Sequence, residues 1–409
     1  MANDSITSVR GFRAAAMHCG IKTTESPDLA LLASDTPATA AAVFTTNRVV
    51  GAPITVGRRH VRNGVLRGVI INSGCSNVCT GQRGVEDAEE MCVLTAASLN
   101  ALADHGNPIH MADILPSSTG IIGHFLPMEK IRPAVGQLAL RLSDSQETGE
   151  AFADAILTTD TRRKTASGTV TLGNKLVTIA GCCKGSGMIA PNMATMLAYV
   201  ATDAAITPAA LRQIMRAATA TTFNSVTVDQ HTSTSDTFAA LANGLAENRL
   251  ILTGSANAKK FQHALHEVCD ALARQIAADG EGATRLVHVH VDQAASEHDA
   301  KKAAFAIANS PLVKTAIHGG DPNWGRFVSA AGYSGAKMRV EKAACCIGAL
   351  AVFRDGRPTE APLSEIEAAM RQPEVHITVS LGFKSRFNWT VYTCDLSREY
   401  ITINADYHT

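Results

Sequence analysis

The sequence has no excess of charge of either sign. Its 37 Lys and Arg residues balance 37 Asp and Glu residues, so the formal net charge at pH 7 is zero. Proteins that bind nucleic acids usually carry a basic excess that is gathered on one surface. We therefore expect small molecules, and no nucleic acid, as the partners of this protein.

Long apolar runs are also missing. No stretch approaches the ~20 consecutive apolar residues that a membrane-spanning helix needs. The first residues of the chain include an acid, Asp4, and lack the apolar centre of a secretory signal. These absences predict a cytoplasmic protein that has no membrane partner.

The ten cysteines form no recognisable framework. Two pairs are adjacent in the chain, such as Cys182 and Cys183, and adjacent cysteines are poor disulfide partners. Cys75 and Cys79 lie close in sequence, but no second pair has the spacing of a zinc site. We expect buried, reduced thiols and no metal.

Apolar residues are plentiful, at 46% of 409 residues, so a substantial core is available. Residues 66–74 read as a buried strand, and residues 85–106, 207–223 and 257–280 read as helices. The third of these ranges begins with Thr-Pro, which is typical of a helix start. Strands and helices follow one another without a regular βαβ rhythm. The pattern predicts a mixed-sheet α/β or α+β body.

One strand raises the question of a metal site. In residues 284–294, valines alternate with His288 and His290, so both histidines point to the same face of a sheet. Two histidines on one face could bind a metal, but no third ligand is evident nearby in the sequence. A polar sheet face is the preferred interpretation.

A bendable loop precedes Thr195 in the stretch KGSGMIAPNMATML, residues 184–197. A threonine hydroxyl needs a base to act as a nucleophile, and an N-terminal threonine carries one in its own α-amine, with a pKa near ~8. The chain would first have to be cut between Ala194 and Thr195, by attack of the same hydroxyl on the preceding carbonyl. By residue type alone, an ordinary strand start explains this pair equally well.

A second turn, LPSSTGIIG, offers matching chemistry at residues 115–123. Gly120 would let a backbone N–H approach a ligand closely, and Thr119 adds a hydroxyl donor beside it. Fixed donors of this kind form an oxyanion hole. The alternative is a hydroxyl-rich turn or a helix cap.

Taken together, these stretches resemble the glutamate N-acetyltransferase / ornithine acetyltransferase family of arginine biosynthesis. The resemblance runs from residue 11 to the last residue. The stretches that carry it, in chain order, are GFRAAAMHCGIK, NSGCSNVCTG, LPSSTGIIG, TTDT, KGSGMIAPNMATML, GEGATR, DPNWGR and INADYHT.

The resemblance implies a self-processing enzyme. Cleavage before Thr195 would give chains 1–194 and 195–409, which fold together as one unit and assemble as an α2β2 heterotetramer. Thr195 would take an acetyl group from N-acetylornithine and pass it to glutamate, without a cofactor. Some members of the family also use acetyl-CoA as a donor. The implied fold is a mixed α/β body with stacked sheets and a smaller second lobe.

The resemblance also assigns site residues. Thr119 and Gly120 match the oxyanion positions. Lys184 would pair with the substrate α-carboxylate and Glu281 with the ornithine ammonium. Each of these residues alone would pass for a surface lysine or a helix-end glutamate. The complete set of matched substrate-binding positions is Thr158, Lys184, Thr195, Glu281, Asn404 and Thr409.

Several positions depart from the family pattern. Gln230 and His231 stand where a Gly-Asp pair is usual, and the loss of the glycine matters if that backbone has a positive φ. His318 and His408 replace an apolar residue and an arginine, and Ser235 stands where an asparagine is usual. These changes leave three alternatives open: a paralogue that acts on a related acyl-amino acid, an amidase or aminopeptidase with the same nucleophile, and an uncleaved structural homologue.

Overall fold

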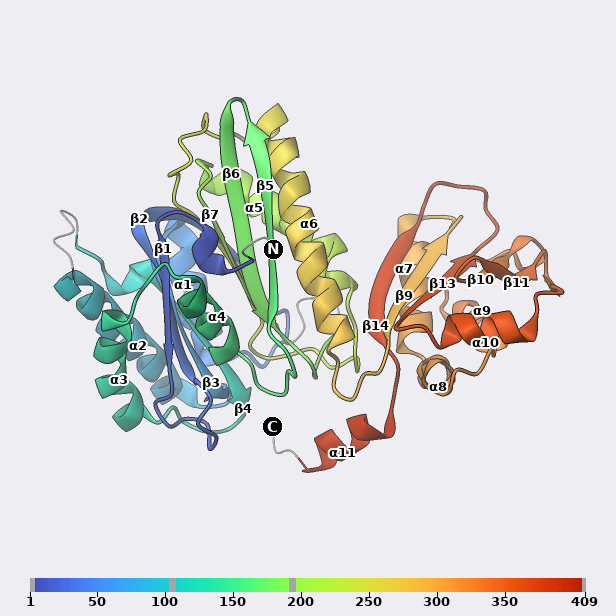
Figure 1. The fold of residues 1–409 in the computed structure, drawn as a ribbon, viewed down its shortest axis with the longest axis horizontal. Coiled ribbons are helices and arrows are strands. Elements are labelled where there is room, and N and C mark those ends of the chain that lie inside the picture. The colour runs from blue at the N-terminus through green and yellow to red at the C-terminus, as the bar shows by residue number, and fades with distance from the viewer. Residues whose placement is uncertain (1–3, 103–107, 191–195, 407–409) are drawn as a thin grey trace.

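The computed structural model describes residues 4–102, 108–190 and 196–406. The chain forms a large lobe, a smaller second lobe, and a C-terminal helix that returns from the second lobe toward the first (Figure 1). Thr195, Ala194, His408 and Thr409 lie outside the described residues.

The large lobe is built on one eight-stranded sheet that folds over itself. The long strand β2 makes the fold: its residues 29–33 pair with β1 and β3, whereas its residues 39–44 pair with β8. The register shifts between these two halves, at Ala33 to Ala38. The strand order is β4-β3-β2-β8-β7-β6-β5, with β1 on β2. The strands are β1 (Phe12–Met17), β2 (Leu29–Phe44), β3 (Val65–Cys75), β4 (Ile114–Ile121), β5 (Lys164–Leu172), β6 (Lys175–Lys184), β7 (Leu197–Thr202) and β8 (Thr237–Ala242).

Alternation of side chains along each strand shows that the two halves of the sheet are stacked. On β7, Leu197 and Tyr199 pack into the same core as Val69 and Ile71 of β3. Their sequence neighbours face outward, because successive side chains of a strand point to opposite sides. Val200, for example, belongs to a separate outer core. The inner core therefore lies between two sheet layers.

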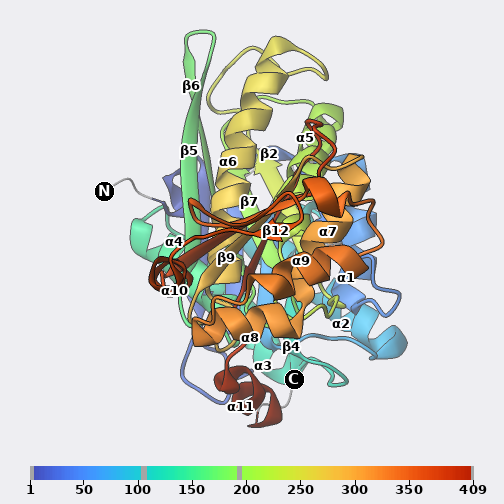
Figure 2. The same ribbon diagram turned by 90° about the vertical axis from the view of Figure 1, so that its right-hand side faces the viewer.

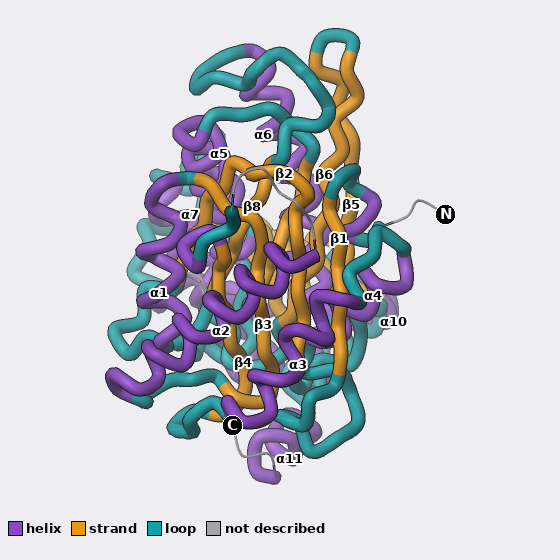
Figure 3. The backbone as a smooth tube through the Cα atoms, turned by 90° about the vertical axis from the view of Figure 1, so that its left-hand side faces the viewer, coloured by secondary structure: helices purple, strands orange, loops and turns teal. Residues whose placement is uncertain are grey.

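Helices cover the outer faces of both layers. Helices α1, α2 and α3 lie over β1–β4 (Figure 3), while α5 and α6 cover β5–β8 and α4 contributes to the inner core. This architecture confirms the predicted stacked-sheet α/β body. These helices are α1 (Ala52–His60), α2 (Gly81–Leu102), α3 (Met128–Leu140), α4 (Gln146–Ala155), α5 (Pro208–Thr221) and α6 (Ala256–Ala278).

The ends of the predicted elements follow local chemistry. The Thr207 hydroxyl accepts the N–H of Ala210, and Pro208 is the first residue of α5, as the sequence predicted. The helix expected from residue 85 is α2, which begins four residues earlier, at Gly81. Gly81 has a φ of +60°, and the Asn77 and Thr80 side chains hydrogen-bond each other just before it.

The second lobe holds a six-stranded sheet in the order β12-β11-β10-β13-β9-β14. The valines of β9 pack against helices on one face, and His288 and His290 lie on the other. Figure 2 shows α8 and α9 on the side of this lobe that faces the viewer. Its elements are β9 (Leu286–Asp292), α7 (Glu297–Asn309), α8 (Pro311–Gly319), α9 (Trp324–Tyr333), β10 (Ala344–Ile347), β11 (Leu350–Arg354), β12 (Arg357–Pro358), α10 (Leu363–Met370), β13 (Glu374–Ser380) and β14 (Trp389–Cys394).

Helix α11 (Arg398–Asp406) fastens the end of the chain to the large lobe. The Ser397 hydroxyl donates to the carbonyl of Gly282 at 2.6 Å, and the Tyr400 hydroxyl lies 3.4 Å from an Asp229 carboxylate oxygen. Short 3-10 turns complete the fold at Ile6–Ser8, Val61–Asn63, Met111–Asp113, Phe223–Ser225 and Val340–Lys342.

The ten cysteines are unpaired, and seven of them are buried, whereas Cys79 is exposed. The prediction of burial holds for these seven, is wrong for Cys79, and does not fit Cys19 and Cys346, which are only partly buried. None of the helices in the described ranges has both the length and the apolar character needed to cross a membrane.

The loop that departs from the family pattern carries backbone strain at one residue. Gln230 is exposed and has a φ of +66°, in the left-handed region that favours glycine. The hydrogen bond that its side chain donates to the Asn309 carbonyl, at 3.1 Å, offsets part of the free energy of this strain.

Replacing this residue with glycine should stabilise the protein. We expect Gln230→Gly to raise the free energy of unfolding by about 0.5–1 kcal/mol, because the strain it removes exceeds one exposed hydrogen bond. Urea denaturation measures the change. Gln213, exposed on helix α5, is the matched control, and its change to Gly should cost about 1 kcal/mol. An equal decrease in the free energy of unfolding for both variants would show that the backbone of Gln230 is not strained.

Candidate functional site

A pocket opens where loops from both sheet layers and helix α11 converge. It brings together all six of the predicted site residues that the structure describes, although they are spread over more than half of the chain. Residues 233–235, which the sequence analysis did not assign, form part of the wall. The lining residues are Ser76, Thr119, Gly120, Ile122, Thr158, Thr159, Lys184, Gly187, Met188, Ser233, Thr234, Ser235, Glu281 and Asn404.

The turn at Gly120 is built by two parallel strands that end side by side. Gly120 pairs in register with Gly74, and both have positive φ values, of +127° and +100°. A Cβ on Gly120 would lie only 2.3 Å from the carbonyl carbon of Gly74, so no side chain fits there. Glycine at position 120 therefore allows the two strand ends to approach closely at the pocket wall.

Side chains next to this turn hold it in place. The Ser118 hydroxyl donates to Asn72 Oδ1 at 2.6 Å, and Asn72 Nδ2 donates to the Cys75 carbonyl at 2.8 Å. The Thr119 hydroxyl makes no hydrogen bond to any described residue, and Thr119 lines the pocket. Thr119 is thus a fixed hydroxyl that can donate to a ligand.

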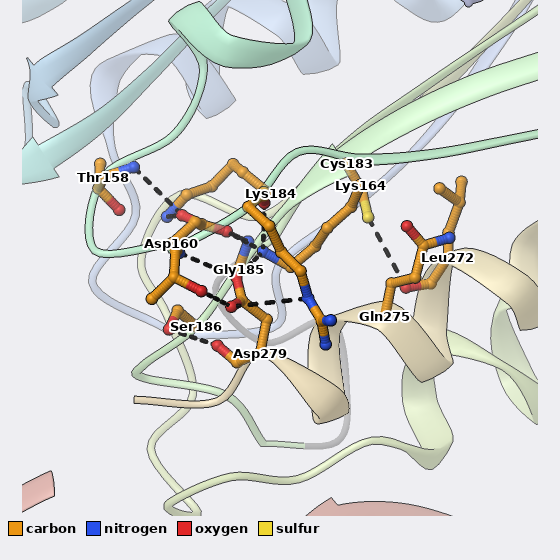
Figure 4. A network of polar contacts seen from close by, with 12 residues as sticks. Thr158, Asp160, Lys164, Cys183, Lys184, Gly185, Ser186, Leu272, Gln275 and Asp279 are labelled. Carbon is orange, nitrogen blue, oxygen red and sulfur yellow. Dashed lines mark hydrogen bonds and ion pairs between the residues drawn. The ribbon is translucent and has the colours of Figure 1, made fainter. Parts of the chain in front are cut away.

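Lys184 is anchored by a network of buried charges (Figure 4). Asp160, which is fully buried, accepts from Lys164 Nζ and from the Gly185 N–H, each at 2.6 Å, through Oδ1. Its other oxygen accepts from the Thr158 N–H at 3.1 Å and lies 3.9 Å from Lys184 Nζ. One carboxylate therefore positions two predicted substrate-binding residues.

The network closes through Asp279 at the end of α6. Lys164 Nζ donates to Asp279 Oδ2 at 2.5 Å, so Lys164 bridges two acids. The Asp279 carbonyl also accepts from the Ser186 hydroxyl at 2.6 Å. Helix α6 and the glycine-rich loop after β6 are thereby tied together below the pocket.

The charges of the network shift the pKa values of its members. Burial opposes the charged form of Asp160, but Lys184 and Lys164 outweigh it and lower the pKa of Asp160 to about 2. Burial lowers the pKa of Lys184, although Asp160 counteracts this effect. Among the described residues, Lys184 has no closer anion than Asp160, so its ammonium group can still gain from a carboxylate ligand.

Glu281 supplies the opposite charge. Its side chain is buried and accepts from Asn404 Nδ2 of helix α11 at 2.8 Å. A Cβ on Gly187 would lie 2.3 Å from the carboxyl carbon, so glycine at this position makes room for the acid. The pocket thus presents a cation, an anion and hydroxyl donors, the groups that would recognise a zwitterionic amino acid.

Asp229 fixes the loop that carries Gly187. It accepts from the Met188 and Ile189 N–H groups at 2.6 and 2.9 Å. Because Tyr400 also reaches this carboxylate, the acid connects the glycine-rich loop to helix α11.

Comparison with known proteins identifies the family. The profile of the ArgJ family matches residues 13–409. The chain belongs to the ArgJ family. The predicted family is therefore confirmed.

This ArgJ family member is similar to named relatives along its whole length. It is 43% identical over 411 residues to the arginine biosynthesis bifunctional protein ArgJ of Dehalococcoides mccartyi (strain CBDB1), covering 100% of this chain and 98% of that protein. It is 45% identical over 409 residues to the protein of the same name from Geobacter sulfurreducens, covering 98% and 100%. A crystal structure of arginine biosynthesis bifunctional protein argJ from Bacillus halodurans is 40% identical, covers 50% of this chain and 96% of that one, and has a TM-score of 0.49.

Sequence reasoning missed the residues that support the ArgJ site. Asp160 lies inside the quoted TTDT stretch and Asp229 inside the departing loop, but neither was assigned a role. No sequence pattern indicates that Lys164 and Asp279 are buried and paired, because a buried charged residue has the same identity in the sequence as an exposed one. The DPNWGR stretch was left out of the predicted site, and none of its residues lines the pocket.

The prediction that no third metal ligand lies near the histidines of β9 is wrong. His376 pairs in register with His288, and Glu374 Oε2 lies 3.3 Å from His288 Nε2 and 3.9 Å from His376 Nε2. These three residues could hold a metal, so a third ligand does exist near His288. Arg274 already pairs with Glu374 at 3.1 Å, which favours the polar-face interpretation.

The central lysine of the network should be essential for stability. We expect Lys164→Met to lower the free energy of unfolding by about 3–5 kcal/mol, because it leaves two buried carboxylates without their shared cation. Urea denaturation of the two proteins measures the loss. Lys175→Met removes an exposed pair with Glu247 and should cost less than about 1 kcal/mol. A Lys164 variant as stable as this control would contradict the role of the network.

Proposed function

We propose that this protein transfers an acetyl group from N-acetylornithine to glutamate in arginine biosynthesis, in the cytoplasm. The observation that carries the proposal is the pocket in which Lys184 and Glu281 offer opposite charges beside the Thr119–Gly120 turn. The names of the relatives, arginine biosynthesis bifunctional protein ArgJ, support it.

The charges of the pocket suit both substrates. N-acetylornithine carries an α-carboxylate for Lys184 and a side-chain ammonium for Glu281, and its acetamide then lies between them. Glutamate carries an α-carboxylate for the same lysine. Thr158 and Asn404 line the pocket and offer further hydrogen-bonding groups, and we assign Thr409 to the same task.

Thr195 is the proposed nucleophile. Its α-amine, free after cleavage from Ala194, takes the proton of its hydroxyl as the oxygen attacks the acetyl carbonyl. The Thr119 hydroxyl and the Gly120 backbone stabilise the oxyanion. Collapse of the intermediate forms an acetyl-threonine ester and releases ornithine, whose amine takes the proton. The neutral amine of glutamate then attacks the ester, the ester C–O bond breaks as N-acetylglutamate forms, and the proton lost by the glutamate amine returns to the hydroxyl of Thr195 through its α-amine.

The proposal extends to maturation and assembly. The same hydroxyl attacks the carbonyl of Ala194, the peptide bond shifts to an ester on the Thr195 oxygen with release of the Thr195 amine, and water hydrolyses this ester. Chains 1–194 and 195–409 remain folded as one unit and pair as an α2β2 heterotetramer. The reaction needs no cofactor. Acetyl-CoA is a second donor to test, because the relatives are named bifunctional.

Removing the nucleophile should abolish both processing and transfer. We expect the wild-type protein to show two masses, for chains of 194 and 409 − 194 = 215 residues, and Thr195→Ala to show one full-length mass. Transfer from N-acetylornithine to glutamate should be absent in the variant. Two chains from the Ala variant would contradict the mechanism. If acetate is released at the same rate whether or not glutamate is present, the acetyl group goes to water and the protein is an amidase.

Removing the oxyanion donor should slow catalysis without unfolding the protein. We expect Thr119→Val to lower kcat by about 10²–10³-fold, measured per processed chain, because valine keeps the volume and loses the hydroxyl. Thr95→Val is the control, because Thr95 is buried in α2, does not line the pocket, and donates its hydroxyl to the Met91 carbonyl. Equal kcat values for the two variants would contradict the assignment.

A further inference from the structure

Asp236 is a buried acid beside the pocket that no step above uses. Its side chain is fully buried at the start of β8, and Asp236 Oδ1 accepts the Met196 N–H at 2.8 Å. The next residue, Thr237, donates its N–H to the Met196 carbonyl at 3.1 Å. Both backbone polar groups of Met196 are therefore held by two consecutive residues of another strand.

The position of Met196 in the chain gives this contact its meaning. Met196 directly follows Thr195, so its N–H belongs to the peptide unit that begins at the Cα of Thr195. A peptide unit is planar and rigid. A group that fixes the N–H of this unit therefore restricts where its other end can lie.

Asp236 is itself held from the opposite side. Its carbonyl accepts the Thr45 N–H at 3.1 Å, and the Thr45 hydroxyl donates to the Ser233 carbonyl at 2.6 Å. Ser233 and the two residues after it line the pocket. The acid thus lies between the pocket wall and the beginning of β7, on a backbone that cannot move freely.

We propose that Asp236 is a positioning residue for the nucleophile, which holds the peptide unit between Thr195 and Met196 in place during cleavage and acetyl transfer, and which does so as a neutral carboxylic acid. The inference rests on the proposed function, in which Thr195 is the nucleophile.

The surroundings of the carboxyl group favour its neutral form. Oδ2 has no hydrogen bond to a residue in the described part of the chain, and burial raises the pKa of Asp236 well above its usual value. The charged group that faces it is Lys184, at the end of β6, which acts in the opposite direction. The Met196 N–H and the side chains of Ser233 and Thr45 also lower the pKa of Asp236, but the effect of burial outweighs all of these groups.

A neutral acid suits the chemistry of an N-terminal threonine. A carboxylate near the α-amine would stabilise its protonated form and make it a poorer base. A carboxylic acid still accepts the Met196 N–H through Oδ1 but adds no negative charge. The amine can then remain unprotonated near neutral pH.

Two substitutions separate the hydrogen bond from the charge. Asp236→Asn keeps an acceptor for the Met196 N–H and is always neutral. We expect it to be cleaved and to keep kcat within about threefold of the wild type. The acidic limb of its kcat/KM profile should not move. Asp236→Ala leaves that N–H without an acceptor and should slow both cleavage and transfer per processed chain by at least about tenfold, since small misplacements of reacting groups are costly.

A matched control is Asp203→Asn. Asp203 is also buried and accepts a backbone N–H, from Thr178 at 2.8 Å, but it does not line the pocket. It should be cleaved at the wild-type rate. Urea denaturation of every variant shows whether the fold is intact, and the Asn variant tests the proposal even if the Ala variant does not fold.

The outcomes distinguish this inference from the proposed function. A wild-type protein that is not cleaved before Thr195 would overturn both. If the wild type is cleaved and the Ala variant is cleaved and active at the same rate, the positioning role alone is wrong. If the Asn variant shifts the acidic limb of kcat/KM to lower pH, a carboxylate had been raising the pKa of the amine, and the neutral state is wrong.

Discussion

The site depends on a buried network of ion pairs, in which loss of one charged group would leave its partners buried and unpaired. Lys164 pairs with both Asp160 and Asp279, and Lys184 pairs with Asp160. The four side chains are almost entirely removed from water. Burying a charge costs several kcal/mol unless it is paired and hydrogen-bonded. Because Lys164 makes the short contacts with both acids, Lys184 is left, among the described residues, with a single ion pair, to Asp160 at 3.9 Å. The fold thereby supports a cation at the pocket that a substrate carboxylate can complete.

The folding of one sheet into two layers explains why distant residues meet. Strand β2 passes from one layer to the other, so the ends of β4 and β6 open toward the same pocket. The first end supplies Thr119 and Gly120, and the second supplies Lys184 with the glycine-rich loop. The chain leaves the second lobe and returns to the large lobe as helix α11, where Asn404 donates a hydrogen bond to Glu281. The hydroxyl, the cation and the amide of the pocket thus come from three different parts of the chain.

Local chemistry made part of this arrangement predictable from the sequence. The Thr207–Pro208 start of α5 and the alternating valines of β9 depend on neighbouring residues only. The glycine turns and the matched motifs predict six residues that line the pocket. Ion pairs across long separations left no such signal: Asp279 lies 115 residues from Lys164, and His376 meets His288 only through strand pairing. The stacking of the two layers likewise depends on a register shift within β2, which no periodicity reveals.

The departures from the family pattern lie mainly around the pocket and not in its lining. Gln230 and His231 are exposed, and His318 contacts Asp395 at 2.7 Å, at the base of helix α11. Ser235 is the exception, because it lines the pocket. Lys184 and Glu281 are therefore not among the departures, which in the described residues fall on the loop around Gln230 and on the contact of His318 with Asp395. A change in substrate preference would therefore arise at the uncharged wall that includes Ser235, because Lys184 and Glu281 still place a cation and an anion in the same pocket.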